Sequence, residues 1–68
     1  MSIFSRNLIS LRKENSISQQ SLARFVGVSQ QCVSEWEKDN IEPTLSNLVR
    51  IADFFDVSLD FLTGRKDY

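Results

Sequence analysis

Apolar side chains recur along this chain at helical spacing. Phe4, Leu8 and Leu11 follow one another at steps of four and three residues, so at about 3.6 residues per turn they line one face of a helix. Ser2 precedes them, and a serine hydroxyl can accept a hydrogen bond from a free amide of the first helical turn. The pattern predicts a helix that Ser2 caps and that ends near Glu14, with this stripe in the core.

Two shorter helices follow, separated by a glycine. Ser18 can cap a helix that runs to about Phe25, and Gly27 then ends it, because glycine adopts left-handed backbone angles without a Cβ clash. Ser29 can cap the next helix two residues later. Two short helices joined by a turn of about three to four residues that contains glycine form a helix-turn-helix, and such motifs bind DNA.

The second of these helices has two different faces. Val33, Trp36 and Glu37 share one side, where the two apolar residues can pack on Leu22 and on the small Ala23 of the preceding helix. The opposite side is polar and can form hydrogen bonds with base edges; it carries Gln31, Ser34, Glu35 and Lys38.

The last third of the chain predicts two more helices. Thr44, directly after Pro43, is expected to cap a helix whose core stripe comprises Leu45, Leu48, Val49, Ala52 and Phe55. Ser58 is expected to cap a last short helix over residues 59–63, which Gly64 ends.

Sixty-eight residues form at most one domain. Five predicted helices and no strand-like alternation indicate an all-α fold, a compact five-helix bundle over residues 1–68 with a frayed tail at 65–68. Hydrophobic residues make up 41% of the chain, which suffices for a small core. Ile51 and Phe54 exceed what that core needs, whereas Phe25 and Val26 are expected to pack in or just beneath its surface rather than stack on bases.

The composition argues against several classes of function. No run of about 18 apolar residues is present and the N-terminal residues lack a signal-peptide pattern, so we expect a cytoplasmic protein without a membrane partner. Histidine is absent and Cys32 is the single cysteine, so we expect no bound metal and no intrachain disulfide. With no activated nucleophile and no Gly-rich phosphate loop, we expect neither an enzyme nor a cofactor or small-molecule ligand. Cys32 is expected to be a small packing residue rather than a redox switch.

Charge is unevenly distributed around a net value of −1. The first 34 residues hold four cations and one carboxylate, whereas the last 34 hold four cations and eight carboxylates. Nucleic-acid affinity depends on a local patch rather than on total charge, so the basic first half is compatible with DNA binding. Few phosphate contacts can be ionic, however, and amides, hydroxyls and helix N-termini must supply many of them.

Residues 8–64 resemble the DNA-binding domain of the lambda-type phage repressors and Cro, the XRE family of helix-turn-helix regulators. The matching residues are Leu11-Arg12, Ser18-Gln19, Leu22-Ala23, Gly27-Val28-Ser29, Val33, Trp36-Glu37, Pro43, Leu45, Leu48, Ala52 and Val57-Ser58-Leu59-Asp60. The resemblance implies a lambda repressor-like fold with the helix-turn-helix at its second and third helices. It also implies a transcriptional regulator, with repression the expected action, that binds a two-fold-related double-stranded DNA operator through the major groove as a homodimer.

The resemblance implies roles for the polar residues of the motif. Gln30 and Gln31 lie at the leading end of the recognition helix, and a glutamine can bind the donor and acceptor that adenine presents at N6 and N7. Ser34 and Glu35 are further candidates for base contacts; Glu35 either accepts from a cytosine amino group or repels phosphate. The expected phosphate contacts are Gln19, Ser29, Lys38 and Asn40.

The loop after the recognition helix departs from the family pattern. The family usually has glycine where Asp39 stands, and often basic residues at Asn40, Ile41 or Glu42. Asp39 or Asn40 can still adopt the left-handed conformation, but Lys38 is left as the only cation of this loop.

The resemblance also implies an internal ion pair and a dimer. Arg12 is expected to pair with Glu37 rather than both charges being exposed and unpaired, which ties the first helix to the end of the recognition helix. Phe54 and Phe61, with Ile41 third, are the candidates for the dimer interface. The alternative function is a protein-interaction module, or an antitoxin-type partner protein, that uses the same fold.

Overall fold

Each helix in the described residues begins after a serine or threonine whose hydroxyl accepts a hydrogen bond from the backbone amide three residues on. The computed structural model describes residues 2–65, and within them the caps are Ser2, Ser18, Ser29, Thr44 and Ser58. They open the helices α1 (Ile3–Glu14), α2 (Gln19–Val26), α3 (Gln30–Glu37), α4 (Leu45–Phe55) and α5 (Leu59–Thr63). All five predicted caps and the all-α, five-helix prediction are confirmed. Of the expected frayed tail, residues 66–68 lie outside the described residues.

Three helices end in the left-handed region. Gly27 and Gly64 have φ angles of 86° and 85°, as their residue type predicts. Asp56 ends α4 at a φ of 56°, and Asp39, just after α3, has a φ of 63°. Aspartate tolerates this conformation better than most side chains do, so Asp39 supplies the chain reversal that was expected of either Asp39 or Asn40.

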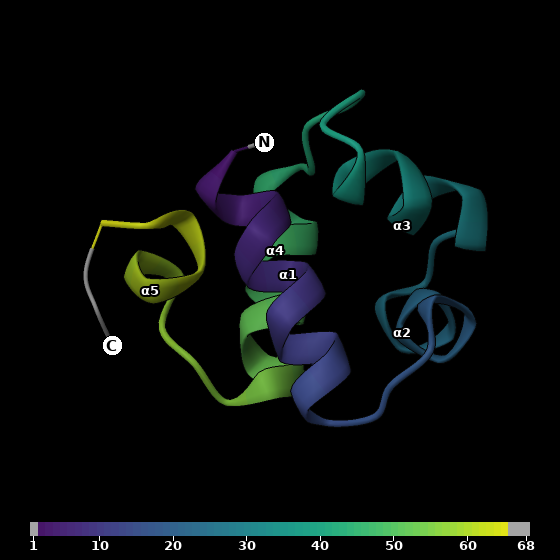
Figure 1. Cartoon of the computed structure of the whole chain (residues 1–68), viewed down its shortest axis with the longest axis horizontal. Coiled ribbons are helices and arrows are strands. Elements are labelled where there is room, and N and C mark those ends of the chain that lie inside the picture. The colour runs from purple at the N-terminus through teal and green to yellow at the C-terminus, as the bar shows by residue number, and fades with distance from the viewer. Residues whose placement is uncertain (1, 66–68) are drawn as a thin grey trace.

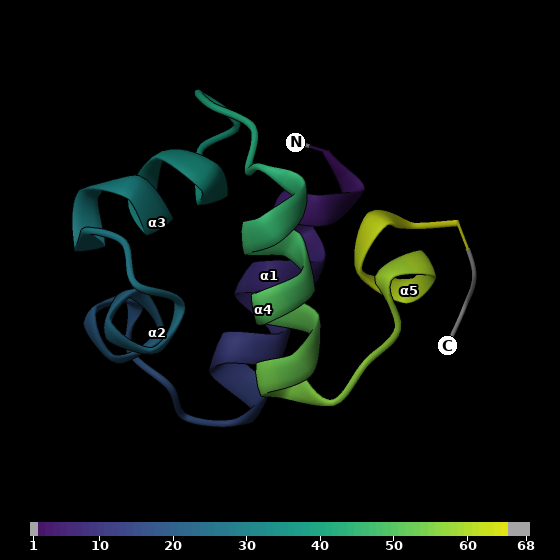
Figure 2. The ribbon, with the colours of Figure 1, turned by 180° about the vertical axis from the view of Figure 1, so that it is seen from behind.

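The five helices pack in a closed ring of contacts. In Figure 1, α1 lies in front of α4, with α2 and α3 to one side and α5 to the other; Figure 2 shows the same arrangement from behind. The packed pairs are α2 with α3, α3 with α1, α1 with α5, α5 with α4, and α4 with α2. The pair α2–α3 is therefore attached to the rest of the domain at two places, through α1 and through α4.

The core lies between these helices. Trp36 is its largest fully buried side chain, and the other buried apolar residues are Leu8, Leu11, Leu22, Ala23, Val26, Val33, Ile51, Ala52 and Leu62. The buried side of α3 is the one that its periodicity predicted. No helix in the described part of the chain combines the length and the apolar character that crossing a membrane requires.

The expected core stripe of α4 is wrong in two positions. Leu45 and Val49 are 69% and 39% exposed, whereas Ile51, expected to be surplus, is completely buried beside Ala52. Leu48 and Phe55 are partly buried against the core. The apolar arc of α4 is wider than the face that packs on the core. Helical periodicity locates the apolar arc, but it does not show which part of the arc the neighbouring helices cover.

Phe25 is a second correction. Its neighbour Val26 is fully buried, but Phe25 is 59% exposed. The Phe25 ring lies against the ring of Phe54 on α4, with 4.3 Å between their centroids, and Phe54 in turn meets Phe55 edge to face. Packing Phe25 against the partly buried ring of Phe54, instead of in the core, leaves an aromatic patch between α2 and α4.

Candidate nucleic-acid interface

The turn between α2 and α3 has the geometry of a helix-turn-helix. Gly27 and Val28 both donate from their backbone N–H groups to the carbonyl of Ala23, at 2.8 and 2.9 Å. The chain then enters α3 at Ser29, whose hydroxyl accepts from the amide of Cys32 at 3.1 Å. Since Ala23 is buried and small, α3 packs closely across α2.

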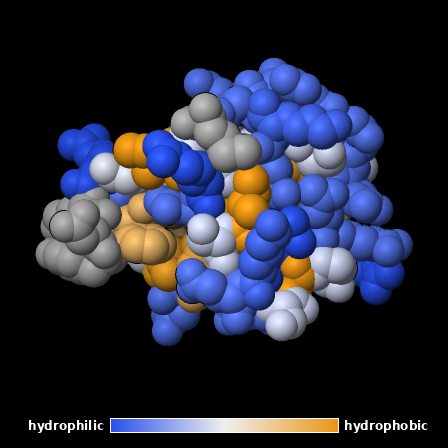
Figure 3. Space-filling view, in the orientation of Figure 1, coloured by the Kyte–Doolittle hydropathy of each residue, from blue (hydrophilic) through white to orange (hydrophobic). Residues whose placement is uncertain are grey.

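The face of α3 opposite the core is polar. Gln30 and Gln31 are exposed in its first turn, and Ser34 and Glu35 are partly exposed one turn later. Figure 3 shows that this side of the molecule, over α2 and α3, is mainly hydrophilic. An eight-residue helix of about 12 Å fits within the major groove.

Three of the predicted DNA-contacting residues are joined in one hydrogen-bonded group. The Glu35 carboxylate accepts from the Gln31 side-chain amide at 2.6 Å and from the Asn40 side-chain amide at 2.7 Å. The hydrogen bond from Asn40 is the main cause that lowers the pKa of Glu35; the bond from Gln31 and the charge of Lys38 add to it, and burial opposes it. Glu35 is therefore ionised at neutral pH.

Two contacts hold the first residues of the loop after α3. The backbone N–H of Asn40 donates to the carbonyl of Glu35 at 3.0 Å, which folds the loop back over the last turn of α3. The Asp39 carboxylate accepts from the backbone N–H of Ser2, and hydrogen bonds with Ser2 lower the pKa of Asp39. The loop that departs from the family pattern is thus tied to the start of α1.

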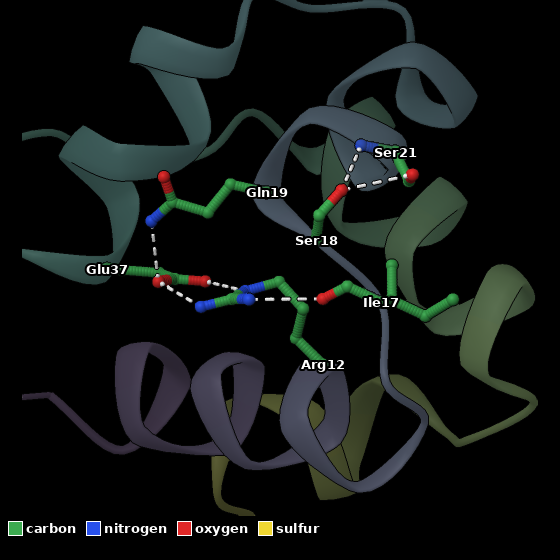
Figure 4. A network of polar contacts seen from close by, with 6 residues as sticks. All are labelled: Arg12, Ile17, Ser18, Gln19, Ser21 and Glu37. Carbon is green, nitrogen blue, oxygen red and sulfur yellow. Dashed lines mark hydrogen bonds and ion pairs between the residues drawn. The ribbon is translucent and has the colours of Figure 1, made fainter.

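A second polar network joins α1, the start of α2 and the end of α3 (Figure 4). Arg12 donates to both oxygens of Glu37, at 2.8 Å from Nε and 3.1 Å from Nη2, and donates from Nη1 to the carbonyl of Ile17 at 3.0 Å. The Gln19 side-chain amide donates to Glu37 at 2.9 Å. The side chains of Arg12 and Glu37 are only 16% and 8% exposed, so their pairing is well shielded from water.

The remaining predicted phosphate contacts lie at the ends of α2 and α3. Gln19 opens α2, Ser29 caps α3, and Lys38 follows α3 with its side chain exposed. Helix N-termini carry unpaired amides that favour an anion. The Gln19 side-chain amide donates one of its two hydrogens to Glu37, so the other hydrogen is available for a phosphate.

One positioning contact could not be predicted from the sequence. Arg50 of α4 donates from Nη1 to the carbonyl of Val26 at 3.0 Å, just before the Gly27 turn. It satisfies a carbonyl that the end of α2 leaves unpaired. The two residues are 24 positions apart, so only the tertiary fold brings them together.

The candidate dimer residues differ in how far they are exposed. Ile41, on the loop before α4, is 46% exposed, whereas Phe54 and Phe61 are partly buried. Phe54 packs on Phe25, and at about 100° per residue it lies across α4 from Leu45. Near Ile41 is a pocket of about 290 Å³, lined by Ser2, Phe4, Asp39, Ile41, Glu42, Pro43, Leu48 and Thr63.

Comparison with known proteins places this geometry in a family. The helix-turn-helix family profile matches residues 8–62. The regulator YqaE of Bacillus subtilis, an uncharacterized HTH-type transcriptional regulator, is 35% identical over 60 residues, which are 88% of this chain and 52% of YqaE. Antitoxin HigA1 of Mycobacterium tuberculosis is 44% identical over 52 residues, 76% of this chain and 35% of HigA1.

Solved structures agree with this assignment. The P22 c2 repressor protein, in a crystal structure with a synthetic operator, superposes with a TM-score of 0.85 at 30% identity, over 97% of this chain and 98% of that one. The chain thus spans about half the length of YqaE and nearly all of the repressor chain in that crystal. The capped α2–turn–α3 unit, the family match and the superposition show that the chain belongs to the helix-turn-helix family of XRE and Cro/C1-type transcriptional regulators.

Proposed function

We propose that this chain binds double-stranded DNA sequence-specifically and represses transcription by occupying an operator, in the cytoplasm. The observation that carries the proposal is α3, which buries Val33 and Trp36 and turns Gln30 and Gln31 outward at its leading end. The recognition helix of this motif enters the major groove with that end. The P22 c2 repressor, which shares this fold, is itself solved with an operator.

The proposed contacts divide into two kinds. Gln30 and Gln31 contact base edges, where a bidentate amide discriminates between bases by about 1–3 kcal/mol, and Ser34 adds a hydroxyl one turn later. Ser29, Lys38, Asn40 and the start of α2 at Gln19 contact phosphates, which set the register of the helix in the groove. The net charge of the chain is −1, which is consistent with phosphate contacts made mostly by neutral donors.

The operator is proposed to have two-fold symmetry and to bind a homodimer. One domain presents too little surface for tight specific binding, and a dimer places two recognition helices about one DNA turn, ~34 Å, apart. Ile41 and Phe61 stay in the proposed interface, and the exposed Leu45 and Val49, which share one side of α4, join them. Phe54 belongs to the separate patch with Phe25 and is the alternative contact.

A second candidate is an antitoxin-type role, in which the domain binds a partner protein as well as DNA. The 44% identity to HigA1 and the exposed apolar residues favour it. Its partner would cover Leu45 or Phe25, and the recognition face would stay free for DNA. The two candidates differ in whether a second protein is needed for full affinity.

Selection of bound fragments from a genomic library, followed by sequencing, tests the proposal. We expect enrichment of a short motif with two-fold symmetry. Fluorescence anisotropy should then show tighter binding to that motif than to a scrambled duplex, with affinity falling as salt rises. Failure to enrich any sequence, with equal affinity for both duplexes, would contradict sequence-specific binding and favour the protein-interaction role.

A further inference from the structure

Gln31, Glu35 and Asn40 form a bridge that spans the recognition surface. Gln31 and Glu35 are four residues apart, so they face the same way on α3. Asn40 reaches them because Asp39 turns the chain back with its positive φ angle. Both carboxylate oxygens of Glu35 are engaged, Oε1 with the Gln31 amide at 2.6 Å and Oε2 with the Asn40 amide at 2.7 Å.

This bridge fixes which groups Gln31 offers to DNA. With one N–H committed to Glu35, the Gln31 amide keeps a second N–H and its carbonyl oxygen. One donor and one acceptor are what adenine N7 and N6 require. Gln30 differs, because no hydrogen bond within the described residues holds its side-chain amide.

We propose that Glu35 is a positioning residue that sets sequence specificity by holding the amide of Gln31, and that it joins this base contact to the phosphate contact of Asn40. The inference rests on the proposed DNA-binding function and refines it. Glu35 then contacts no base itself, because its oxygens face the two amides. Ordering Gln31 in advance lowers the entropy cost of its base contact, since fewer rotamers must be frozen on binding.

Two simpler roles for Glu35 lead to different outcomes. A carboxylate that accepts from cytosine would specify a base pair of its own, and its loss would add to the loss of Gln31. A carboxylate that only repels phosphate would weaken binding to all DNA, and its removal would strengthen cognate and random duplexes equally. A positioning role instead makes the effects of Glu35 and Gln31 non-additive at one base pair.

The experiment compares Glu35→Ala, Gln31→Ala and the double variant. Each is titrated by anisotropy against the selected operator, against duplexes with single base-pair changes, and against a scrambled duplex. We expect Gln31→Ala to lose about tenfold in discrimination at one base pair, ~1.4 kcal/mol, and Glu35→Ala to lose most of the same factor at the same pair. The double variant should lose no more than Gln31→Ala alone.

Two further variants separate hydrogen bonding from charge. Glu35→Gln keeps an oxygen that accepts from Gln31 and should retain most of the discrimination. Glu42→Ala removes the same charge two residues beyond Asn40, where the carboxylate has no partner among the described residues, and should leave discrimination unchanged. Additive losses, a loss at a different base pair, or a uniform gain on all duplexes after Glu35→Ala would each overturn the inference.

A measurement without DNA tests the bridge independently of the proposed function. In NMR spectra, Glu35→Ala should shift the side-chain amide signals of both Gln31 and Asn40, whereas Glu42→Ala should move neither. Unmoved signals would overturn the bridge even if the wild type binds DNA specifically. Shifted signals in a protein that discriminates no sequence would instead show that the proposed function has failed while the bridge stands.

Discussion

Arg12 of α1 and Glu37 at the end of α3 form a two-point ion pair across 25 residues of chain, with 2.8 Å between Nε and Oε2. The third nitrogen of the same guanidinium holds the carbonyl of Ile17, directly before the cap of α2. One side chain therefore fixes the start of α2 and the end of α3 against α1. The angle between the two helices of the motif depends on this contact as well as on the turn at Gly27.

Removing either member of the pair should destabilise the domain. Arg12→Met or Glu37→Met leaves the partner charge largely buried and without its mate, which costs about 3–5 kcal/mol in such settings. The double variant should recover much of that loss. Urea unfolding of the four proteins gives the coupling energy.

Lys13→Met is the matched control, because Lys13 is the exposed neighbour of Arg12. It should change the free energy of unfolding by no more than about 0.5 kcal/mol. Single losses that add without coupling would show that the pair does not act as a unit.

Gln30 is expected to be a direct base contact. Gln30→Ala should weaken binding to the selected operator by about 1–3 kcal/mol and leave binding to a scrambled duplex nearly unchanged. Anisotropy titrations at one fixed salt concentration measure both. Equal losses on the two duplexes would remove Gln30 from the base-contacting set.

Salt should affect binding less than in basic relatives. The cations of residues 1–38 are Arg6, Arg12, Lys13, Arg24 and Lys38, and Arg12 is committed to Glu37. Four or fewer ionic contacts per subunit give a dimer a slope of log affinity against log salt no steeper than about −7, at ~0.9 per phosphate. A slope steeper than about −8 would imply that Arg50, Arg65 or Lys66 also reach DNA.

The dimer proposal separates two apolar surfaces. Leu45→Lys changes a 69% exposed side chain, so the monomer should fold normally but lose affinity for the full operator while keeping weak half-site binding. Phe54→Lys should instead lower stability, because the Phe54 ring packs on Phe25 and Phe55. Thermal melts together with operator titrations distinguish the two effects.

The same variants can also contradict the proposal that Leu45 lies in the dimer interface. A folded Phe54→Lys protein that loses operator binding, beside a Leu45→Lys protein with full affinity, would move the interface to the Phe25 patch. Phe61→Lys should weaken the dimer if that ring faces the partner, and unfolding of this variant would place the ring in the core.

Acid should destabilise the loop after α3. The pKa values of Glu35 and Asp39 are both lowered in the folded chain, the first mainly by Asn40 and the second by Ser2. Their contribution to stability is therefore present above the unfolded pKa values and is lost as pH falls from about 5 toward 2. Asp39→Asn should show a smaller loss of stability over that range than the wild type, in urea melts at fixed pH values. An unchanged pH dependence would contradict a stabilising role for ionised Asp39.

Local signals in the sequence predicted most of the fold. A serine or threonine before each apolar run located all five helix starts, because N-capping acts within three residues. Gly27 and Gly64 likewise marked two ends. The predictions that failed depend on neighbouring helices. Leu45 and Val49 fit the apolar period of α4, yet the described residues leave them 69% and 39% exposed. Phe25 packs against Phe54 instead of entering the core.

The candidate site, like the fold, has parts that the sequence predicts and parts that depend on tertiary contacts. Residue type and helical phase identified the outward amides of α3, and family resemblance led to the pair of Arg12 with Glu37. The bridge through Glu35 depends on the reversal at Asp39, which brings Asn40 over the last turn, and sequence offered two residues for that reversal. The contact of Arg50 with the end of α2 depends on how α4 crosses α2, and a local sequence pattern does not predict how two helices cross.

Trp36 is the single tryptophan of the chain and lies in α3 with 1% of its surface exposed. Its indole faces the core, on the side of the helix opposite Gln31. Helix α3 therefore carries its own fluorophore, which is shielded from solvent. Emission from Trp36 should report whether α3 is seated on the domain, and DNA bound at the proposed recognition face would not contact the indole. Folding could then be followed by tryptophan emission and binding by anisotropy of the DNA, in the same cuvette.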